Sequence, residues 1–280
     1  MAGRAAFIYG YPVGHSISPI IHNAAFEALG LDVRYAAREV APDDLPGAVG
    51  ALRERNVVGA NITLPHKQAA MELVDEVDEQ AQAIGAINTI QNLGGRLRAG
   101  NTDAPGFARS LAEVGFTPEG ASVLLLGAGG AARAVSDALL GAGARRLLIA
   151  NRSSERAARL AAELGARFGK SQVESVALAA LCPAGVAGCS LVVNTTTVGL
   201  DGDETPLPAE LLPAAGLVVD IIYRPPRTRL LREAQRAGLP ILNGLPMLVH
   251  QAAAAWELWM GRSAPLDLMR SAAQAALVGR

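Results

Sequence analysis

The sequence predicts an α/β protein made of two α/β units. Three observations predict this fold class. Short β-branched or apolar runs alternate with longer helical runs along the chain, which is typical of parallel sheets covered by helices. The 280 residues suffice for two ordinary domains. A second alternating series begins at Ser122, after a helix that we expect at Asp103–Val114.

The first series contains strands, a hairpin and short helices. Strands are expected at Ala5–Tyr9, Val33–Val40 and Val57–Leu64. Two runs that flank Gly94-Gly95 indicate a hairpin. The first helix follows a loop rich in Gly, Pro and Ser. Ser18-Pro19 fits its N-cap and first helical position, and Gly30 ends it. Further helices are expected at 43–54, 65–74 and 77–84.

The second series has the stricter β/α alternation. Its strands are expected at 123–126, 146–150, 191–194, 217–220 and around Ile241. Its helices are expected at 131–140, 154–164 and 227–237, and two more helices at 246–259 and 265–277 end the chain.

Composition excludes several classes of function. The formal net charge is -1 and no basic run is present, so binding to nucleic acid through a basic face is not expected. The longest apolar stretches carry Arg and Asp side chains, which argues against membrane spans. The 2 cysteines and 4 histidines lack zinc-ligand spacing, so we expect no metal. Met1–Gly10 is too short for a secretion signal, and we expect a cytoplasmic protein with reduced cysteines.

A glycine-rich turn after the strand at 123–126 has the spacing of a dinucleotide-binding loop. It fits G-x-G-x-x-A with Gly127, Ala128, Gly129, Gly130, Ala131 and Ala132. The first glycine permits a tight turn, the second lets backbone amides approach a pyrophosphate, and the last small residue allows close packing of helix on strand. The start of the next helix then faces the anion. An ordinary structural turn is the alternative.

The end of the next strand distinguishes between the two nicotinamide cofactors. NAD-binding chains usually carry an acidic residue there, which binds the ribose 2′-hydroxyl. This chain has Asn151, Arg152 and Ser153, with Arg156 one turn later. Guanidinium groups bind a 2′-phosphate through charge-assisted hydrogen bonds. NADP is therefore the expected cofactor. Two solvated arginines at a helix start are the alternative, and Glu155 would weaken the preference.

Polar residues in the first half indicate a substrate site. Ser16 and Ser18 place two hydroxyls where a loop enters a helix, which suits a carboxylate. On the residues alone, the interpretation of Ser18 as only a helix cap is favoured. Lys67 is predicted in the first turn of a helix, although helix N-termini favour anions. A lysine whose neutral form is favoured there can exchange a proton with a reacting oxygen.

Several segments, in order along nearly the whole chain, resemble the shikimate dehydrogenase family. The most specific are Asn61-Ile62-Thr63-Leu64-Pro65-His66-Lys67 and Asn101-Thr102-Asp103. The loop at Ser16, the turn at 127–133 and the segments 85–89, 151–153, 193–196, 220–223 and 244–251 also match.

The resemblance implies a two-domain enzyme that reduces 3-dehydroshikimate with NADPH. Its fold would comprise an N-terminal mixed-sheet substrate domain (1–103 and 246–280) and a C-terminal Rossmann-like NADP domain (104–245), with the C-terminal helices returning to the first domain. Lys67 and Asp103 would be catalytic. The substrate would be held by Ser16, Ser18, Thr63, Lys67, Asn88, Asp103, Tyr223 and Gln251. Besides the glycine-rich turn, the cofactor would contact Asn151, Arg152, Ser153, Arg156, Thr195, Gly244 and Met247.

The sequence does not decide whether Lys67 or Asp103 moves the proton, or whether the protein is a monomer or a homodimer. Two rivals remain. One is a quinate/shikimate dehydrogenase with relaxed substrate or NAD use, and the other is a non-catalytic NADP-binding sensor.

Overall fold

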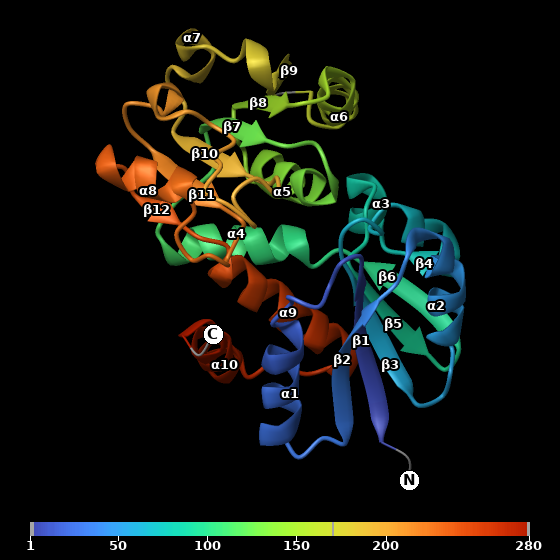
Figure 1. The fold of residues 1–280 in the computed structure, drawn as a ribbon. Coiled ribbons are helices and arrows are strands. Elements are labelled where there is room, and N and C mark those ends of the chain that lie inside the picture. The colour runs from blue at the N-terminus through green and yellow to red at the C-terminus, as the bar shows by residue number, and fades with distance from the viewer. Residues whose placement is uncertain (1–2, 170, 279–280) are drawn as a thin grey trace. The chain divides into compact units, whose positions relative to one another are not determined.

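A computed structural model describes residues 3–169 and 171–278. The chain divides into two compact units. Unit 1 comprises Met1–Gly106 with Val249–Arg280, and unit 2 comprises Phe107–Leu248. The division falls within the helices α4 (Asp103–Glu113) and α9 (Leu245–Met260). Each unit contains one six-stranded sheet (Figure 1).

The sheet of unit 1 is mixed and has the order β2-β1-β3-β5-β6-β4. Pairs β1–β2, β1–β3 and β4–β6 are parallel, whereas β3–β5 and β5–β6 are antiparallel. The strands are β1 (Arg4–Gly10), β2 (Val33–Glu39), β3 (Val57–Ile62), β4 (Glu76–Val77), β5 (Thr89–Leu93) and β6 (Arg96–Gly100). The order reverses at β1, and the carboxyl ends of β1 and β3 lie side by side because Tyr9 pairs with Ile62. Ligands of α/β sheets bind at such reversal points.

Helices cover both faces of this sheet (Figure 1). One face carries α1 (Ser18–Ala28), most of α9 and α10 (Leu266–Val278). The other carries α2 (Leu45–Ala51) and α3 (Glu79–Ile84) with the 3₁₀ turns η1 (Pro42–Asp44) and η2 (Ala69–Leu73). Val49 of α2 and the following Leu52 pack in one core with strand residues such as Ile62 and Ile90.

The sheet of unit 2 is entirely parallel, with the order β12-β11-β10-β7-β8-β9. Its strands are β7 (Ser122–Leu126), β8 (Arg146–Asn151), β9 (Gln172–Ala177), β10 (Leu191–Asn194), β11 (Leu217–Asp220) and β12 (Ile241–Leu242). This order is that of a Rossmann sheet, in which the strand order reverses between the first and fourth strands. The reversal point therefore lies between β7 and β10.

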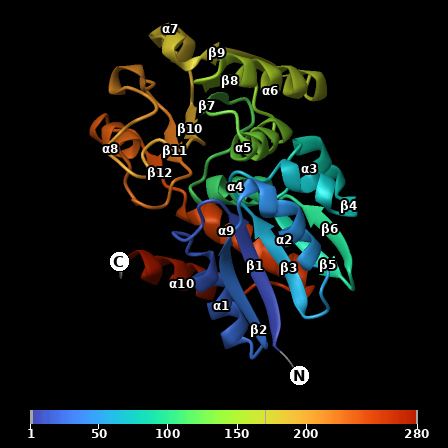
Figure 2. The same ribbon diagram turned by 45° about the vertical axis from the view of Figure 1, so that its right-hand side comes forward.

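Two cores sandwich the second sheet. One contains Phe107 and Leu111 of α4 with side chains of α5 (Gly130–Gly141) and α6 (Ser154–Arg167). The other contains Val186 of α7 (Pro183–Val186) and side chains of α8 (Arg229–Arg236). Figure 2 shows α5 and α6 on one side of the sheet and α8 on the other. The short turns η3 (Leu178–Ala180) and η4 (Ala209–Leu211) complete this unit.

The predicted fold class is confirmed, including the return of the C-terminal helices. Helix α10 belongs to unit 1, where it packs against α1. The strand β9 and the helix α7 were not predicted. Because β9 is a half-exposed edge strand with glutamine and glutamate among its residues, it lacks the apolar run by which the other strands of its sheet are found.

Three local predictions were wrong. No α-helix covers 65–74: a turn leads into η2, because the Lys67 carbonyl accepts a hydrogen bond from Ile87 N at 2.9 Å. Lys67 is therefore not at an α-helix N-terminus. The segment 77–84 is divided between β4 and α3, and Asp78 caps α3 by accepting from Ala81 N. Ser18 is the first residue of α1 and not its N-cap, which is Ile17.

Candidate active site

Lys67 and Asp103 form an ion pair in unit 1 through Nζ and Oδ2. Their side chains are 17% and 7% exposed, respectively. An ion pair withdrawn this far from water interacts more strongly than a surface pair, because solvent screens it less. The pair places an ammonium proton donor and a carboxylate acceptor within one small volume.

Asn88 holds the second oxygen of the carboxylate. Its Nδ2 donates to Asp103 Oδ1 at 2.8 Å and to Thr102 Oγ1 at 2.9 Å, and its Oδ1 accepts from Thr102 N at 2.7 Å. Gln251 Oε1 lies 3.5 Å from the same Asn88 Nδ2. Unit 1 thus brings together four of the predicted substrate residues, namely Lys67, Asn88, Asp103 and Gln251.

The local sequence explains why Asp103 stands at this point. Asn101 Oδ1 accepts from the backbone N of Asp103 at 3.0 Å and of Ala104 at 3.3 Å, so Asn101 caps the start of α4. Asn101 Nδ2 in turn donates to Ala86 O at 2.8 Å. Asp103 is the first residue of α4, where the helix dipole favours a negative charge.

A glycine allows Gln251 to approach this centre. A Cβ on Gly106 of α4 would lie 2.8 Å from Gln251 Cβ and 2.9 Å from Gln251 N. Because real Cβ atoms almost never approach so closely, only glycine permits α4 and α9 to cross at this distance. Gly106 therefore contributes to the position of Gln251 beside Asn88.

The predicted hydroxyl residues lie at the carboxyl ends of β1 and β3. Ser16 Oγ accepts from Ser18 N and donates to Ser18 Oγ, both at 3.2 Å. Thr63 N donates to Tyr9 O at 2.8 Å. A Cβ on Gly10 would lie 2.4 Å from Thr63 Cγ2, so Thr63 packs directly against the end of β1. Thr63 therefore stands at the reversal point of the sheet, and Ser16 and Ser18 lie where the segment after β1 enters α1.

In unit 2 the glycine-rich turn lies between β7 and α5, as predicted. Gly127 has φ +112°, which favours glycine, and a Cβ there would lie 2.6 Å from Thr195 Oγ1. Thr195 itself donates to Leu126 O through N at 2.9 Å and through Oγ1 at 2.7 Å. Gly129 is the N-cap of α5, and a Cβ there would meet no atom within 4 Å. Backbone amides at the start of a helix beside open space suit a pyrophosphate.

The predicted phosphate side lies at the end of β8. Asn151 Nδ2 donates to Ser153 O at 3.0 Å, and Ser153 caps α6 by accepting from Arg156 N at 3.3 Å. Arg152 and Arg156 are exposed. Neither guanidinium forms an ion pair with a carboxylate of residues 3–169 or 171–278. Both are therefore available to an external anion.

The remaining predicted residues also belong to unit 2. Tyr223 follows β11 and is half-buried, and it lies in a different unit from the other predicted substrate residues. Gly244 N donates to Ile222 O at 3.1 Å, and a Cβ on Gly244 would lie 1.9 Å from Ile221 O. Met247 is buried in the core with the side chains of α5 and α6, so any contact with a cofactor would come from its backbone.

Family models match three parts of the chain. A shikimate dehydrogenase substrate binding domain matches residues 8–90, a shikimate / quinate 5-dehydrogenase model matches 110–182, and a shikimate 5′-dehydrogenase C-terminal domain matches 244–274. The shikimate dehydrogenase (NADP(+)) of Symbiobacterium thermophilum is 48% identical over 287 residues, which cover 99% of this chain and 96% of that one. The chain belongs to the shikimate dehydrogenase family.

Solved structures of this family agree with the fold. The shikimate 5-dehydrogenase of Thermus thermophilus, in complex with NADP(H) and shikimate, has a TM-score of 0.88 and 43% identity, over 98% of this chain and 100% of that one. The quinate dehydrogenase of Corynebacterium glutamicum, in complex with NAD, also has a TM-score of 0.88, with 30% identity over 98% of this chain and 99% of that one. The same fold therefore occurs in proteins that are named for different substrates and were solved with different cofactors.

A buried polar chain lies behind the family's lysine and aspartate, and sequence reasoning did not find it. Tyr35 OH donates to Asn61 Oδ1 at 2.7 Å, Asn61 Nδ2 donates to Thr89 Oγ1 at 3.0 Å, and Thr89 Oγ1 donates to Asn88 Oδ1 at 3.0 Å. Burial raises the pKa of Tyr35 well above its ordinary value, so its hydroxyl remains a donor. The polar residues of β3 and β5 were a signal in the sequence, but Tyr35 in β2 gave none.

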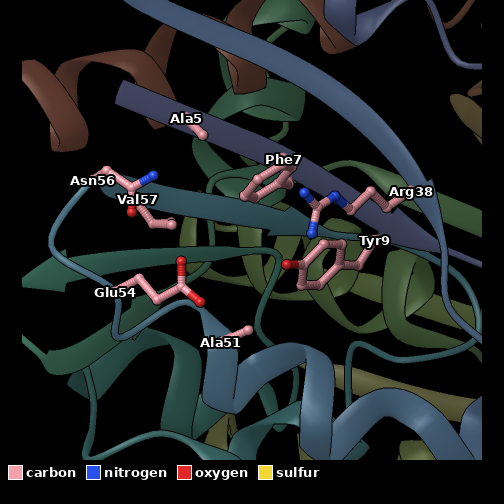
Figure 3. Close-up of a pocket in the computed structure, with 8 residues that line it drawn as sticks. All are labelled: Ala5, Phe7, Tyr9, Arg38, Ala51, Glu54, Asn56 and Val57. Carbon is pink, nitrogen blue, oxygen red and sulfur yellow. The ribbon is translucent and has the colours of Figure 1, made fainter. Parts of the chain in front are cut away.

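A cavity in unit 1 is separate from these residues. It has a volume of about 120 Å³ and is drawn in Figure 3. Arg38 lies over the Phe7 ring, 3.9 Å from its centroid. The cavity is lined by Ala5, Phe7, Tyr9, Arg38, Ala51, Glu54, Asn56 and Val57. None of the predicted site residues lines it, and it is not a candidate for the substrate site.

Metal-binding clusters and membrane-spanning helices are both absent from the described residues. That part of the chain holds no group of three His, Cys, Asp or Glu side chains that could bind a metal ion. Of the helices between residues 3 and 278, excluding the undescribed residue 170, none is long and apolar enough to cross a membrane.

Proposed function

We propose that this chain is a shikimate dehydrogenase that reversibly reduces 3-dehydroshikimate to shikimate with NADPH, in the pathway to aromatic amino acids. The observation that carries the proposal is the withdrawn ion pair of Lys67 and Asp103, with Asn88 on the second carboxylate oxygen. Family membership, and the relatives named for NADP(+) and shikimate, support it. Burying charged groups costs free energy, and the binding of a polar substrate accounts for that cost.

The side chains of the site have separate roles in the reaction. Lys67 donates a proton to the ketone oxygen and stabilises the negative charge that develops there. Asp103 accepts a hydrogen bond from the adjacent substrate hydroxyl and orients Lys67. Thr63, Asn88 and Gln251 bind further hydroxyls. The serines at 16 and 18, with Tyr223, bind the carboxylate.

Unit 2 fits NADP. The open space at Gly129 and the free amides of α5 suit the pyrophosphate. Asn151, Ser153 and the exposed Arg152 and Arg156 suit the 2′-phosphate. When bound, NADPH supplies the hydride. Thr195 and the backbone at Gly244 and Met247 contribute further contacts to NADP. Residues 104–245 thus form the cofactor domain, and residues 1–103 with 246–280 form the substrate domain.

A steady-state assay tests the proposal. Shikimate and quinate are each assayed with NADP and with NAD. The expected result is the highest kcat/KM for shikimate with NADP. A preference for NAD would show that the arginines do not bind a phosphate, and a preference for quinate would favour the sister activity. Binding of NADP without turnover of either substrate would favour a sensor.

Location and assembly are further parts of the proposal. We infer a cytoplasmic protein, supported by the two free thiols Cys182 and Cys189, since disulfides are rare in that compartment. A monomer or a homodimer is expected, and light scattering after size exclusion would distinguish them.

A further inference from the structure

Asp220 is a fully buried carboxylate at the end of β11. Its Oδ1 accepts from Asn194 Nδ2 at 3.0 Å and from Ile222 N at 3.1 Å, and its Oδ2 accepts from Thr228 Oγ1 at 2.7 Å. No arginine or lysine pairs with it among the described residues. Burial raises the pKa of Asp220, against the three hydrogen bonds, which lower it. A carboxylate without a counter-ion is a costly way to fill a core.

The first of these bonds leads to the glycine-rich turn. Asn194, also fully buried, accepts through Oδ1 from Thr196 N at 2.9 Å and Thr196 Oγ1 at 2.8 Å. The neighbouring Thr195 is bonded to Leu126 O, and its Oγ1 occupies the space that a Cβ on Gly127 would need. The segment after β10 therefore forms one wall of the turn, and Asn194 fixes that wall.

The second bond leads to the segment after β11. Ile222 N donates to Asp220, while Ile222 O accepts from Gly244 N at 3.1 Å. A Cβ on Gly244 would overlap the backbone of Ile221. The start of α9 thus rests on the 221–222 backbone, and its position depends on where Asp220 holds that backbone.

The third bond fixes the helix that follows. Thr228 caps α8 by accepting from Leu231 N at 3.4 Å while it donates to Asp220. One carboxylate therefore joins three segments at the same edge of the sheet: the segment after β10, the segment after β11 and the start of α8.

We propose that Asp220 is a positioning residue for NADP, which acts through Asn194 on the wall of the glycine-rich turn and through Ile222 on the backbone at Gly244. The inference rests on the proposed function, because it assumes that these segments contact the cofactor. Asp220 itself touches neither substrate nor cofactor. Its loss should weaken NADP binding and leave the substrate residues of unit 1 intact.

The test compares Asp220→Ala with Asp220→Asn. The alanine removes all three hydrogen bonds. The asparagine retains an oxygen for Asn194 and Ile222 and turns its amide toward the Thr228 hydroxyl, which can accept. The control is Asp137→Ala, because Asp137 is the other buried aspartate of unit 2 and its ion pair with Arg167 joins α5 to α6. The readouts are the NADP dissociation constant by calorimetry, and kcat with the KM for each substrate.

For Asp220→Ala we expect NADP to bind about tenfold more weakly or worse, the scale of loss when a binding group is displaced. The KM for shikimate should rise less than the NADP dissociation constant, because Tyr223, which follows the displaced Ile222, is the one proposed substrate residue that lies in unit 2. Asp220→Asn should recover most of the affinity, and Asp137→Ala should match the wild type. If Asp220→Ala aggregates, Asn194→Ala is tested in its place. This variant removes the hydrogen bonds from Thr196 to Asn194 and should weaken the binding of NADP more than that of shikimate.

Several outcomes would overturn the inference. NADP affinity unchanged in both Asp220→Ala and Asn194→Ala would show that the network does not position the cofactor. So would equal losses for NADP and shikimate, or equal losses in the Asp137→Ala control, which indicate a purely structural role. Failure of the wild type to bind NADP would instead refute the proposed function, so the two failures are distinguishable.

Discussion

Replacement of His22 by leucine should remove part of the acid sensitivity of unit 1. His22 of α1 is completely buried. Its ring stacks on Tyr35 at 4.4 Å and lies 5.2 Å from the ring of Trp259. Within the described residues, neither ring nitrogen has a hydrogen-bond partner. Burial lowers the pKa of His22 from 6.5 to about 3, because the charged imidazolium is poorly solvated there.

The direction of the effect follows from proton linkage. The folded protein keeps His22 neutral down to about pH 3, whereas the unfolded chain protonates it below about pH 6.5. The unfolded state therefore binds more protons in this window, and the free energy of unfolding falls as the pH falls. Well above pH 6.5, His22 is neutral in both states, so its ionisation lowers the free energy of unfolding only below that pH. Between pH 7 and pH 5 these two pKa values give a loss of about 2 kcal/mol.

Tryptophan fluorescence during urea unfolding measures the loss in unit 1, which contains His22. Both tryptophans of the chain, Trp256 and Trp259, lie in the part of α9 that belongs to unit 1. The wild type should lose about 2 kcal/mol more than His22→Leu between the two pH values. His15→Asn, at an exposed histidine, is the control and should behave as the wild type. Equal losses in wild type and His22→Leu would refute the linkage.

Three further predictions follow from the site. Arg152→Ala should lower kcat/KM for NADP by about tenfold to a hundredfold, the value of a hydrogen bond to a charged group, and leave that for NAD unchanged; an equal effect on both cofactors would count against a phosphate contact. Asn88→Ala should lower kcat by about tenfold or more, because the carboxylate of Asp103 loses its second hydrogen bond; an unchanged kcat would contradict that role. Gly106→Ala should lower the free energy of unfolding by about 1–3 kcal/mol through overpacking against Gln251. Its control, Gly165→Ala in α6, meets no atom within 4 Å and should raise stability by about 0.5–1 kcal/mol, so equal signs would refute the close-crossing argument.

The parts of the fold predicted from the sequence are those with strong local signals. The parallel strands of unit 2 are apolar runs, and the glycine-rich turn has its strand before it and its helix after it. Edge strand β9 was missed because its burial is partial and its composition mixed. The turn at Lys67 was mistaken for a helix, because its decisive bond, from Ile87 N to Lys67 O, joins residues far apart in sequence.

The site shows the same division between local and long-range signals. Lys67, Asn88 and Asp103 were predicted from short motifs, and the structure brings them into contact. The support behind them was not predictable in the same way. Tyr35 of β2 reaches Asn61 of β3 across the intervening strand β1, and Gly106 matters only because α9 crosses α4 there. Such contacts depend on packing between elements, which no short segment encodes.

The proposed reaction depends on Lys67 as the carrier of the proton at the reacting oxygen. Its most direct test is the steady-state rate of Lys67→Ala with shikimate and NADP. We predict that kcat falls by about 10²–10⁴-fold, the usual contribution of a general acid or base, while the KM for shikimate changes far less. A near-normal kcat in this variant would remove Lys67 from catalysis and contradict the claim.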